Sequence, residues 1–398
     1  MVSRHPSSFD TFEFRLAIML EPLQIPLQLR GQTLANRIVM SPMSRYFCAG
    51  GVPTAAVTDY YRRRAQGGVG LIITEGVAID HPVAVDNPGI PHLVGDETLA
   101  GWRGVVEAVH AASCPIWPQL WHQGAMWNVE FAGAKAGGGS ALRPSGIWGP
   151  PDGTISVRPE KRAESLLETA PMTEEQIADA IAAYARSARN AIHVGFDGIA
   201  IHGAHGYLID SFLWAYTNRR TDRWGGGGGE RARFGAEVVR AIRAEVGDAV
   251  PIALRISQFK MQDFRARLAD TPDELAALLG PLSDAGVDLF DCSQRFFDTP
   301  LFDGSSLNLA GWVRKLTGVR SMTVGGVGLG KSGKPASHID GSQPSDNNLD
   351  RLLARFERDE FDLVAIGRSL LNDADWLRKA MERREFLPFD PANLERLA

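Results

Sequence analysis

The sequence from Gly198 to Phe234 reads GIAIHGAHGYLIDSFLWAYTNRRTDRWGGGGGERARF, and the organisation of the whole chain follows from it. Its first residues, Gly198–Ile201, are a short apolar run that predicts one buried strand of a parallel sheet. His202, His205 and Tyr207 follow directly. Because parallel strands end at the face where α/β folds carry their chemistry, three polar rings at this point predict a catalytic site. The alternative is that one or two of these rings are core or turn residues.

Segments with strand-like and helix-like patterns alternate on both sides of this stretch. The other predicted strands are Ile38–Ser41, Leu71–Thr74, Cys114–Leu120, Pro251–Ile256, Leu289–Ser293, Ser321–Val324 and Leu363–Ile366. The predicted helices are Thr54–Gln66, Leu99–Ala112, Thr173–Val194, Glu230–Val246, Thr271–Ala285, Leu309–Leu316 and Leu349–Glu357. Eight strands in such an alternation close a (β/α)8 barrel, the TIM-barrel class of α/β fold. We find no boundary that divides the chain, so residues 19–398 are expected to form one domain.

Four segments lie outside this alternation. Pro22–Leu34 predicts a hairpin that closes the bottom of the barrel. Trp121–Pro171, after the third strand, is rich in Gly, Pro and Trp and too long for a mere connection, which indicates a functional loop or a lid. Gly328–Asn347 is polar and rich in Gly and Ser, which is typical of a surface loop. Residues 1–18 are expected to be a flexible N-terminal extension.

The composition is that of a soluble globular protein, with 44% apolar and 22% charged residues. A net charge of −5 gives no reason to expect nucleic acid or an anionic membrane as a partner. No segment reaches the ~18 consecutive apolar residues of a membrane span. The N-terminus also lacks the uninterrupted apolar stretch of a signal peptide.

Three cysteines, Cys48, Cys114 and Cys292, are scattered along the chain. Their odd number and wide spacing predict neither a disulfide framework nor a metal site. We therefore expect a reducing compartment, the cytoplasm, and no bound metal.

Two glycine signals late in the chain indicate a phosphate site. Gly325 and Gly326 follow the predicted seventh strand, and Gly367 and Arg368 follow the eighth. Barrels often bind phosphate at these two loops, because glycine lets backbone N–H groups approach the ligand and arginine can hold its oxygens. The alternative is that the glycines only make turns.

Arg255 closes the predicted strand Pro251–Ile256 and is expected to point into the barrel mouth. A cation in such a position is costly unless it is paired. The partner is either a ligand or a neighbouring carboxylate, and the sequence leaves both open.

The stretch HGAHGYLIDSFL, with TNRRTDRWGG and RARF after it, resembles the signature of the old yellow enzyme family of FMN-dependent ene-reductases. The resemblance extends from about Leu20 to Lys379 and is most specific here. Two departures occur in this segment: the glycine run 225–229 replaces Gly-Gly-Ser, and Trp224 stands where tyrosine is commoner. PQLWHQG also resembles the family's QLWHAGR, with Ala125 in place of its arginine, so no role is carried over from that arginine.

The resemblance implies a bound FMN and assigns its contacts. VGGV and AIGRSLL match the phosphate loops, and Arg255 matches the arginine at the pyrimidine edge of the flavin. Gln119 matches a glutamine that hydrogen-bonds the ring, and Gly76 matches a position whose backbone faces a flavin carbonyl. Pro42, Met43 and Ser44 of SPMSR match the segment against the flavin, with Ser44 where relatives have threonine or cysteine.

The resemblance also implies the reaction. NADH or NADPH reduces the flavin, which passes a hydride to an alkene activated by a carbonyl or nitro group. His202 and His205 are expected to bind the substrate oxygen, and Tyr207 to donate a proton to the α-carbon. Tyr46 matches a tyrosine that contacts substrate in bacterial relatives. The preference between NADH and NADPH and the physiological alkene are not readable.

Three other functions stay open at this point. The first is flavin chemistry on another substrate class, which the missing cysteine clusters disfavour. The second is a phosphate-binding isomerase or lyase without redox chemistry, and the third is a non-catalytic flavin carrier. Relatives are often monomers or dimers, so a monomer or homodimer is expected.

Overall fold

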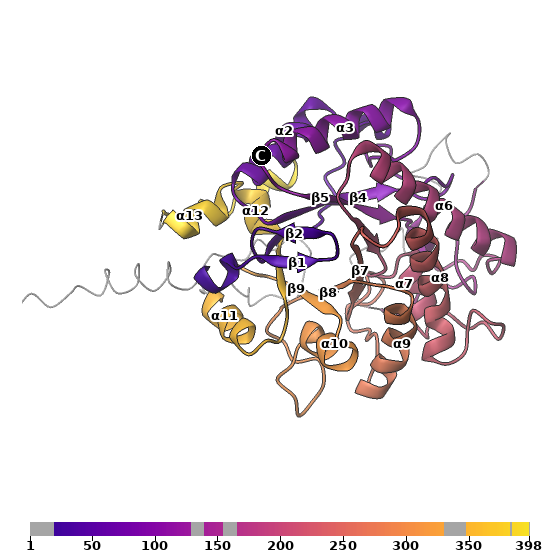
Figure 1. Ribbon diagram of the computed structural model, residues 1–398. Coiled ribbons are helices and arrows are strands. Elements are labelled where there is room, and N and C mark those ends of the chain that lie inside the picture. The colour runs from indigo at the N-terminus through magenta and orange to yellow at the C-terminus, as the bar shows by residue number, and fades with distance from the viewer. Residues whose placement is uncertain (1–19, 129–138, 154–164, 330–347, 383, 398) are drawn as a thin grey trace, which may run out of the picture.

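The structure is a computed structural model, and it describes residues 20–128, 139–153, 165–329, 348–382 and 384–397. Its parallel strands are β3 (Ile38–Met40), β4 (Leu71–Ala78), β5 (Ile116–Trp121), β6 (Ile199–His202), β7 (Ile252–Ser257), β8 (Leu289–Ser293), β9 (Arg320–Val324) and β10 (Leu363–Ile366). They follow one another around a closed barrel, and β10 pairs with β3 to complete it (Figure 1). The predicted (β/α)8 barrel is therefore confirmed.

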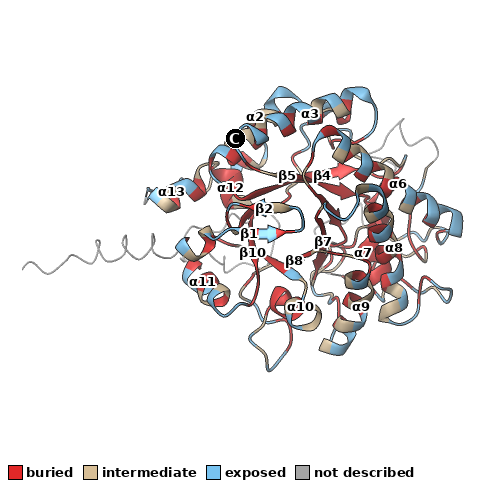
Figure 2. Ribbon diagram, viewed as in Figure 1, coloured by how far each residue is buried: buried red, intermediate tan, exposed pale blue. Residues whose placement is uncertain are grey.

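Helices surround the barrel and present their apolar sides to it. They are α2 (Ala55–Gln66), α3 (Asp96–His110), α6 (Glu174–Val194), α7 (Leu208–Leu213), α8 (Gly228–Val246), α9 (Pro272–Asp284), α10 (Leu309–Thr317), α11 (Leu349–Glu357), α12 (Arg368–Asn372) and α13 (Trp376–Glu382). Short 3₁₀ turns occur at Glu21–Gln24, Ala49–Gly51, Gly124–Met126 and Pro391–Leu394. Figure 2 shows the burial pattern that results, with buried strands and with helices exposed on their outer sides.

The ends of α6 show how the sequence sets a helix boundary. The Thr173 side chain accepts a hydrogen bond from the backbone N–H of Gln176, and the Gln176 side chain accepts one from the N–H of Thr173. This reciprocal capping satisfies two N–H groups that the first turn would leave unpaired. Gly195 ends the helix with φ 104°, a left-handed conformation that glycine adopts without strain.

An antiparallel hairpin of β1 (Leu27–Leu29) and β2 (Gln32–Leu34) covers the end of the barrel where the strands begin, as predicted (Figure 1). The indole N–H of Trp117 donates to the side-chain oxygen of Gln32 at 2.9 Å and ties the hairpin to the interior. Three hairpin leucines join the inward-facing residues of the strands in one buried cluster of Leu27, Leu29, Leu34, Val39, Leu71, Ile73, Trp117, Ala200, Ala253, Leu289, Met322, Leu363 and Ala365. This cluster fills the lower barrel, so the barrel is a packed core and not a pore.

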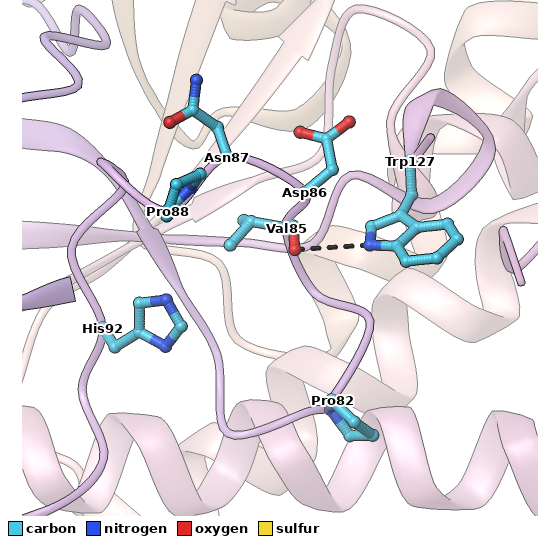
Figure 3. Close-up of a pocket in the computed structure, with 7 residues that line it drawn as sticks. All are labelled: Pro82, Val85, Asp86, Asn87, Pro88, His92 and Trp127. Carbon is cyan, nitrogen blue, oxygen red and sulfur yellow. Dashed lines mark hydrogen bonds between the residues drawn. The ribbon is translucent and has the colours of Figure 1, made fainter. Parts of the chain in front are cut away.

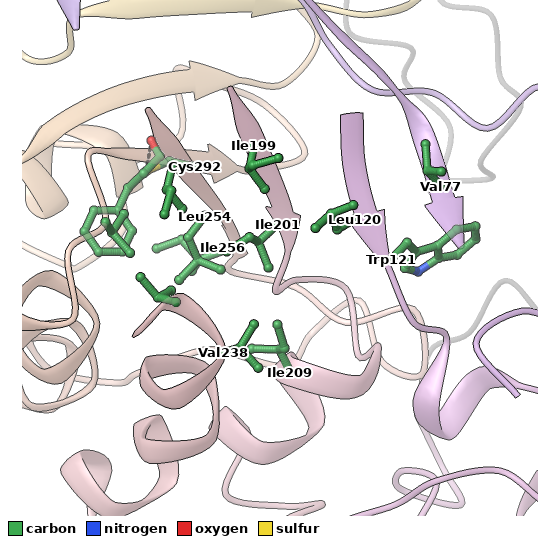
Figure 4. Close-up of a cluster of buried hydrophobic side chains, with 14 of the residues drawn as sticks. Val77, Leu120, Trp121, Ile199, Ile201, Ile209, Val238, Leu254, Ile256 and Cys292 are labelled. Carbon is green, nitrogen blue, oxygen red and sulfur yellow. Dashed lines mark hydrogen bonds between the residues drawn. The ribbon is translucent and has the colours of Figure 1, made fainter. Parts of the chain in front are cut away.

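A second, larger apolar cluster lies between the strands and the helices. Figure 4 shows part of it, where Ile201 of β6 and Leu254 of β7 project outward toward Val238 of α8 and Ile209 of α7. Alternate residues of each strand therefore belong to the interior cluster and to the helix-facing cluster, as the two-residue period of a strand requires.

Strand β4 departs from the prediction, because it runs on to Ala78 beyond the expected end at Thr74. Its register with β5 shifts between Ile73 and Gly76, which marks a bulge. Glu75 lies in this bulge and is only 1% exposed. Its carboxylate accepts the backbone N–H groups of Arg45 at 2.8 Å and Tyr46 at 3.3 Å, and thereby ties the segment after β3 to β4.

The short helices α7, α12 and α13 were not predicted. Isolated helices of this length are not stable by propensity, and tertiary packing decides whether they form. α7 and α12 are almost wholly buried, which explains why their sequences carry no amphipathic signal. Other boundaries differ by a few residues: α3 begins at Asp96 rather than Leu99, and α8 includes the last two glycines of the run 225–229.

Some predicted segments lie outside the described residues. They are the N-terminal extension 1–18, the parts 129–138 and 154–164 of the loop after β5, and 330–347 of the late polar loop. Within the described ranges, no helix has both the length and the apolar character needed to cross a membrane.

Gly198 gives a first testable prediction about packing. A Cβ at this position would lie 2.5 Å from Cε2 of Trp117, which is held inside the barrel. We expect Gly198→Ala to lower the free energy of unfolding by about 1–3 kcal/mol through overpacking. Gly104→Ala is the control, because a Cβ at this exposed position of α3 meets nothing within 4 Å. The control should raise stability by about 0.5–1 kcal/mol, and equal effects of both changes in urea unfolding would contradict the prediction.

Glu75 gives a second prediction, about pH. Burial raises the pKa of its carboxyl from 4.5 to about 7, although the two backbone N–H groups favour the ionised form. The folded protein therefore binds a proton that the unfolded chain releases between these values, so this carboxyl makes stability fall as the pH rises from about 4.5 to 7. Glu75→Gln removes that dependence. Urea unfolding of the parent and of Glu75→Gln at a series of pH values measures this. The difference between their unfolding free energies should change by about 3 kcal/mol from about pH 4.5 to pH 8. A difference that stays constant over this range would contradict the prediction.

Candidate active site

The end of the barrel where the strands finish is lined by polar side chains. It lies above the apolar interior cluster that fills the lower barrel, which we call the apolar plug. Inward positions alternate along each strand, so the residues two places beyond the plug also point inward. On β6 and β7 these residues are His202 and Arg255, which are paired in register. On β8 it is Asp291, in register with Arg255, and on β5 it is Gln119. Side chains from four strands therefore meet at the mouth where the strands end.

The structure brings the three predicted rings together. The ring centroids of His202 and His205 lie 5.2 Å apart, and those of His202 and Tyr207 lie 4.8 Å apart, both in edge-to-face arrangements. Trp121 stacks beside His202 at 6.0 Å and meets Tyr207 edge-on at 5.0 Å. The rings thus converge from β6, the turn after it and the end of β5.

His202 is held as a neutral imidazole. It is 6% exposed, and its burial together with the nearby Arg255 charge places the pKa of the ring well below its usual range. Its Nδ1 accepts the backbone N–H of Ala204 at 3.3 Å. The proton of the neutral ring therefore lies on Nε2, which leaves a hydrogen-bond donor on the other side of the ring.

His205 is fixed by two serines. Its backbone N–H donates to the Ser257 hydroxyl, and its Nε2 lies 2.8 Å from the Ser293 hydroxyl. The backbone of His205 has φ 63°, a left-handed conformation that is uncommon outside glycine. A strained residue that its neighbours hold on both sides is typical of a functional site.

Tyr207 keeps its proton at neutral pH. Burial, followed by the neighbouring Tyr46 and Asp86, raises the pKa of its phenol above the usual value of 10.0. Tyr207 also precedes α7 as its N-cap, so its backbone direction is set by that helix. The arrangement offers one neutral imidazole donor and one phenolic acid in adjacent positions.

Arg255 has a carboxylate partner. Its Nε donates to Asp291 at 2.5 Å, and its terminal nitrogen donates to the Ser41 hydroxyl at 3.0 Å. The salt bridge that the sequence left open as an alternative is therefore present. The pair orients the guanidinium across the mouth from β7 toward β3, which is compatible with an additional ligand.

Gln119 and Gly76 lie side by side, because they are paired in register between β5 and β4. Gly76 permits a close approach: a Cβ there would lie 2.4 Å from the Trp121 ring. The side-chain nitrogen of Gln119 is buried and has no hydrogen-bond partner in the described structure. A buried unpaired donor at the mouth fits an acceptor on a bound ligand.

The segment Pro42–Tyr46 runs from the end of β3 across the mouth. Met43 approaches Gly367, where a Cβ would lie 3.3 Å from the Met43 sulfur. Ser44 is partly buried, and Tyr46 is 51% exposed with φ 63°. The segment thus connects the predicted ring-binding residues with the loop after β10.

The two predicted phosphate loops are adjacent, since β9 and β10 are neighbours in the barrel. Gly325 and Gly326 follow β9 with φ 147° and 69°, and a Cβ on Gly325 would collide with the Gln294 carbonyl oxygen at 2.3 Å. Arg368 follows Gly367. Burial lowers its pKa, and the nearby Arg295 lowers it further. No carboxylate of the described residues pairs with Arg368.

These observations fit the phosphate and the ring of an FMN. The guanidinium groups of Arg368 and Arg295 lie near each other, and no described carboxylate pairs with Arg368. Such an arrangement favours a bound anion. The glycines permit the backbone approach that phosphate binding needs. The unpaired donor of Gln119 lies at the mouth, where an aromatic ring with acceptor atoms would contact it.

Three further residues complete the site and were not singled out from the sequence. Trp121 packs on both His202 and Tyr207, Phe259 lies 5.0 Å from the His205 ring, and Ser293 binds His205. Ser293 ends a predicted strand and Trp121 directly follows one, so their positions were a usable signal. Phe259 lies in an irregular segment after β7, where the sequence gives no such signal.

A separate hollow of about 90 Å³ lies beside the loop that follows β4 (Figure 3). The indole N–H of Trp127 donates to the backbone oxygen of Val85 across it at 3.3 Å. Its lining is Pro82, Val85, Asp86, Asn87, Pro88, His92 and Trp127, and none of the three converging rings belongs to it. This hollow is therefore not the candidate site.

Comparison with known proteins identifies the family. Residues 22–297 match the model of the NADH:flavin oxidoreductase / NADH oxidase family. 12-Oxophytodienoate reductase 7 from Oryza sativa subsp. japonica is 39% identical over 240 residues, which cover 59% of this chain and 58% of that protein. The chain thus spans less than two thirds of this relative's length.

Two solved structures share the fold over most of both chains. An old yellow enzyme homologue from Zymomonas mobilis has a TM-score of 0.75 and 24% identity, with 94% of this chain and 96% of the other covered. Morphinone reductase in complex with tetrahydroNAD has a TM-score of 0.74 and 25% identity, with 94% and 93% covered. The family model matches more than half of this chain. The chain therefore belongs to the NADH:flavin oxidoreductase / NADH oxidase family, which is the old yellow enzyme family that its sequence motifs resemble.

Proposed function

We propose that the protein is an FMN-dependent reductase that uses NADH or NADPH to saturate a C=C bond conjugated to a carbonyl or nitro group. One observation carries the proposal: a neutral His202, a tethered His205 and a protonated Tyr207 converge above Gln119 at the barrel mouth. This arrangement supplies hydrogen bonds for a developing oxyanion and a proton for carbon. Family membership supports the redox part of the proposal.

The residues that would hold FMN lie around the mouth. Gly325, Gly326, Gly367 and Arg368 would bind the phosphate, and Gln119 and Arg255 would contact the polar edge of the ring. The remaining ring contacts would come from Pro42, Met43, Ser44 and Gly76. When bound, FMN supplies the redox chemistry by accepting a hydride from the nicotinamide coenzyme and donating it to the alkene.

His202 and His205 would stabilise the charge that develops on the substrate oxygen. The Nε2–H of His202 is free of intramolecular bonds among the described residues, while its Nδ1 is occupied by Ala204. His205 is fixed through Ser293 at Nε2, so its ring orientation is set before substrate arrives. Each such donor is worth about 3 kcal/mol in the transition state.

Tyr207 would donate a proton to the α-carbon once the β-carbon has received the hydride. Its raised pKa ensures that the phenol carries that proton near neutral pH. The tyrosinate that results is then reprotonated by solvent. Tyr46, exposed at the mouth, would contact the substrate from the opposite segment.

The nicotinamide coenzyme would approach the same mouth. A hollow of about 280 Å³ lies between the loops after β7 and β8, beside Phe259. Arg265 and Arg267 are among its lining residues, and their positive charge suits the diphosphate of such a coenzyme. Morphinone reductase, which shares the fold, has been solved with tetrahydroNAD.

The colour of the purified protein separates this proposal from its main alternative. A colourless purified protein would favour an isomerase or lyase without redox chemistry.

Tyr207→Phe tests the proton donor. We expect anaerobic flavin reduction by NADPH to keep its rate within about twofold, because no proton from Tyr207 is needed there. Re-oxidation by 2-cyclohexenone should slow by about 10²-fold or more. Stopped-flow absorbance of the flavin measures both steps. Equal slowing of the two half-reactions would show that Tyr207 has another role.

Arg368→Gln tests the phosphate site independently of turnover. Losing a charge-assisted hydrogen bond costs about 1.5–3 kcal/mol, so the dissociation constant of FMN should rise about 10- to 100-fold. Titration of the flavin-free protein with FMN, followed by flavin fluorescence, measures it. Arg240→Gln on the outer side of α8 is the control, because its one ion pair within the described part of the chain is with the exposed Glu237. Unchanged affinity in Arg368→Gln would place the phosphate elsewhere.

A further inference from the structure

Lys260 and Asp210 form an ion pair that is wholly buried. Both side chains are 0% exposed, and Nζ of Lys260 lies 2.6 Å from Oδ1 of Asp210. Asp210 belongs to the short helix α7, and Lys260 lies in the irregular segment after β7. A buried ion pair contributes little net stability compared with apolar residues of the same size. Its place in the fold indicates another role.

The pair acts on the peptide groups of Gly206. The second carboxylate oxygen of Asp210 accepts the N–H of Gly206 at 2.6 Å. The side-chain nitrogen of Gln262 donates to the carbonyl oxygen of Gly206 at 3.0 Å and to that of Trp148 at 3.2 Å. Both polar groups of Gly206 are therefore held by the side chains of this small cluster.

The turn that is held in this way is strained. The strain lies at His205, with φ 63°, and the next residue, Gly206, has φ 82°, which glycine adopts without strain. A Cβ on Gly206 would lie 1.8 Å from the side-chain oxygen of Gln262, so the two segments are packed without spare room. Sparsely populated backbone conformations persist only where the surroundings hold them. Lys260, Asp210 and Gln262 provide that restraint.

We infer that Lys260, Asp210 and Gln262 are positioning residues for Tyr207. The inference rests on the proposed role of Tyr207 as proton donor. The carboxylate of Asp210 fixes the His205–Gly206 peptide, and Gln262 fixes the Gly206–Tyr207 peptide through its carbonyl oxygen. Lys260 favours the ionised form of that carboxylate and holds its orientation. All three side chains are fully buried, so they would act through the backbone and not by direct contact with substrate or flavin.

Tyr207 depends on this restraint more than His205 does. His205 has its own tethers, through Ser257 at its backbone and Ser293 at its ring. The Tyr207 hydroxyl makes no hydrogen bond to another side chain in the described structure. Its direction is set by the backbone and by ring contacts with His202 and Trp121. Loosening Gly206 should therefore displace the phenol first.

The experiment compares Lys260→Met with Lys379→Met. Lys379, in the last turn of α13, makes a similar, largely buried pair at 2.8 Å with Asp373, the residue that ends α12, rather than with a residue beside the converging rings. We expect Lys260→Met to slow re-oxidation of the reduced flavin by 2-cyclohexenone about 10- to 100-fold, because small displacements of a reacting group are costly. Reduction by NADPH should stay within about twofold in both variants. Equal slowing of both steps in Lys260→Met would overturn the inference.

A double variant separates positioning from general damage. Lys260→Met alone leaves the Asp210 charge buried and unpaired, whereas Lys260→Met with Asp210→Asn leaves two neutral groups and an oxygen for the Gly206 N–H. Because the two residues are in contact, their effects in a double-mutant cycle should not be additive. We expect the double variant to recover at least about half of the loss in the logarithm of the re-oxidation rate. If the rate losses of the two substitutions simply add, Lys260 and Asp210 do not act as a unit, and the inference fails. The double variant also serves if Lys260→Met alone fails to fold.

Hydrogen exchange gives a readout that does not depend on turnover. In the purified full-length protein, amides of the peptide 203–213 should exchange faster in Lys260→Met than in Lys379→Met, because the Gly206 N–H loses its fixed acceptor. Equal exchange would overturn the inference. If Tyr207→Phe leaves re-oxidation unchanged, the proton-donor role fails, and the exchange result still decides whether the cluster holds the turn.

Discussion

The alternation of side chains along eight closed strands is the constraint on which the rest of the structure depends. A residue that faces inward at one level is followed by another two places later, so the interior is a stack of layers. Ala200, Ala253 and Leu289 belong to the apolar layer, and the next inward residues on the same strands are His202, Arg255 and Asp291. The hairpin seals the lower end with leucines. The same geometry therefore produces a stable plug below and a polar mouth above.

Electrostatics divides that mouth into two parts. Arg255 is neutralised by Asp291, so its part of the mouth is complete without a ligand and is preorganised to donate hydrogen bonds. Arg368 and Arg295 lie near each other, and no described carboxylate pairs with Arg368. Burial of like charges is unfavourable, and an anion removes the penalty. Binding of a phosphate would therefore be driven by relief of repulsion, whereas the ring edge would be recognised by groups already held in place.

Much of this could be predicted from the sequence because the signals are local. Each strand is a short apolar run, and HGAHGY places three rings at the end of one of them, so fold and trio were both readable. Residues whose roles depend on distant contacts were not. Lys260 lies fifty positions from Asp210, and Ser293 lies far from His205. The buried helices α7 and α12 were missed because their formation depends on packing that no local pattern records.

Burial gives the converging rings their chemical character. Desolvation disfavours the charged form of each group, so it lowers the pKa of the His202 imidazole and raises that of the Tyr207 phenol. Both groups are therefore neutral donors over the same wide range of pH. A cationic histidine would bind a ground-state anion tightly, whereas a neutral donor gains most when charge develops on its acceptor. In the proposed reaction, such donors would stabilise an oxygen that becomes negative, and the adjacent phenol would keep its proton until the carbon accepts it.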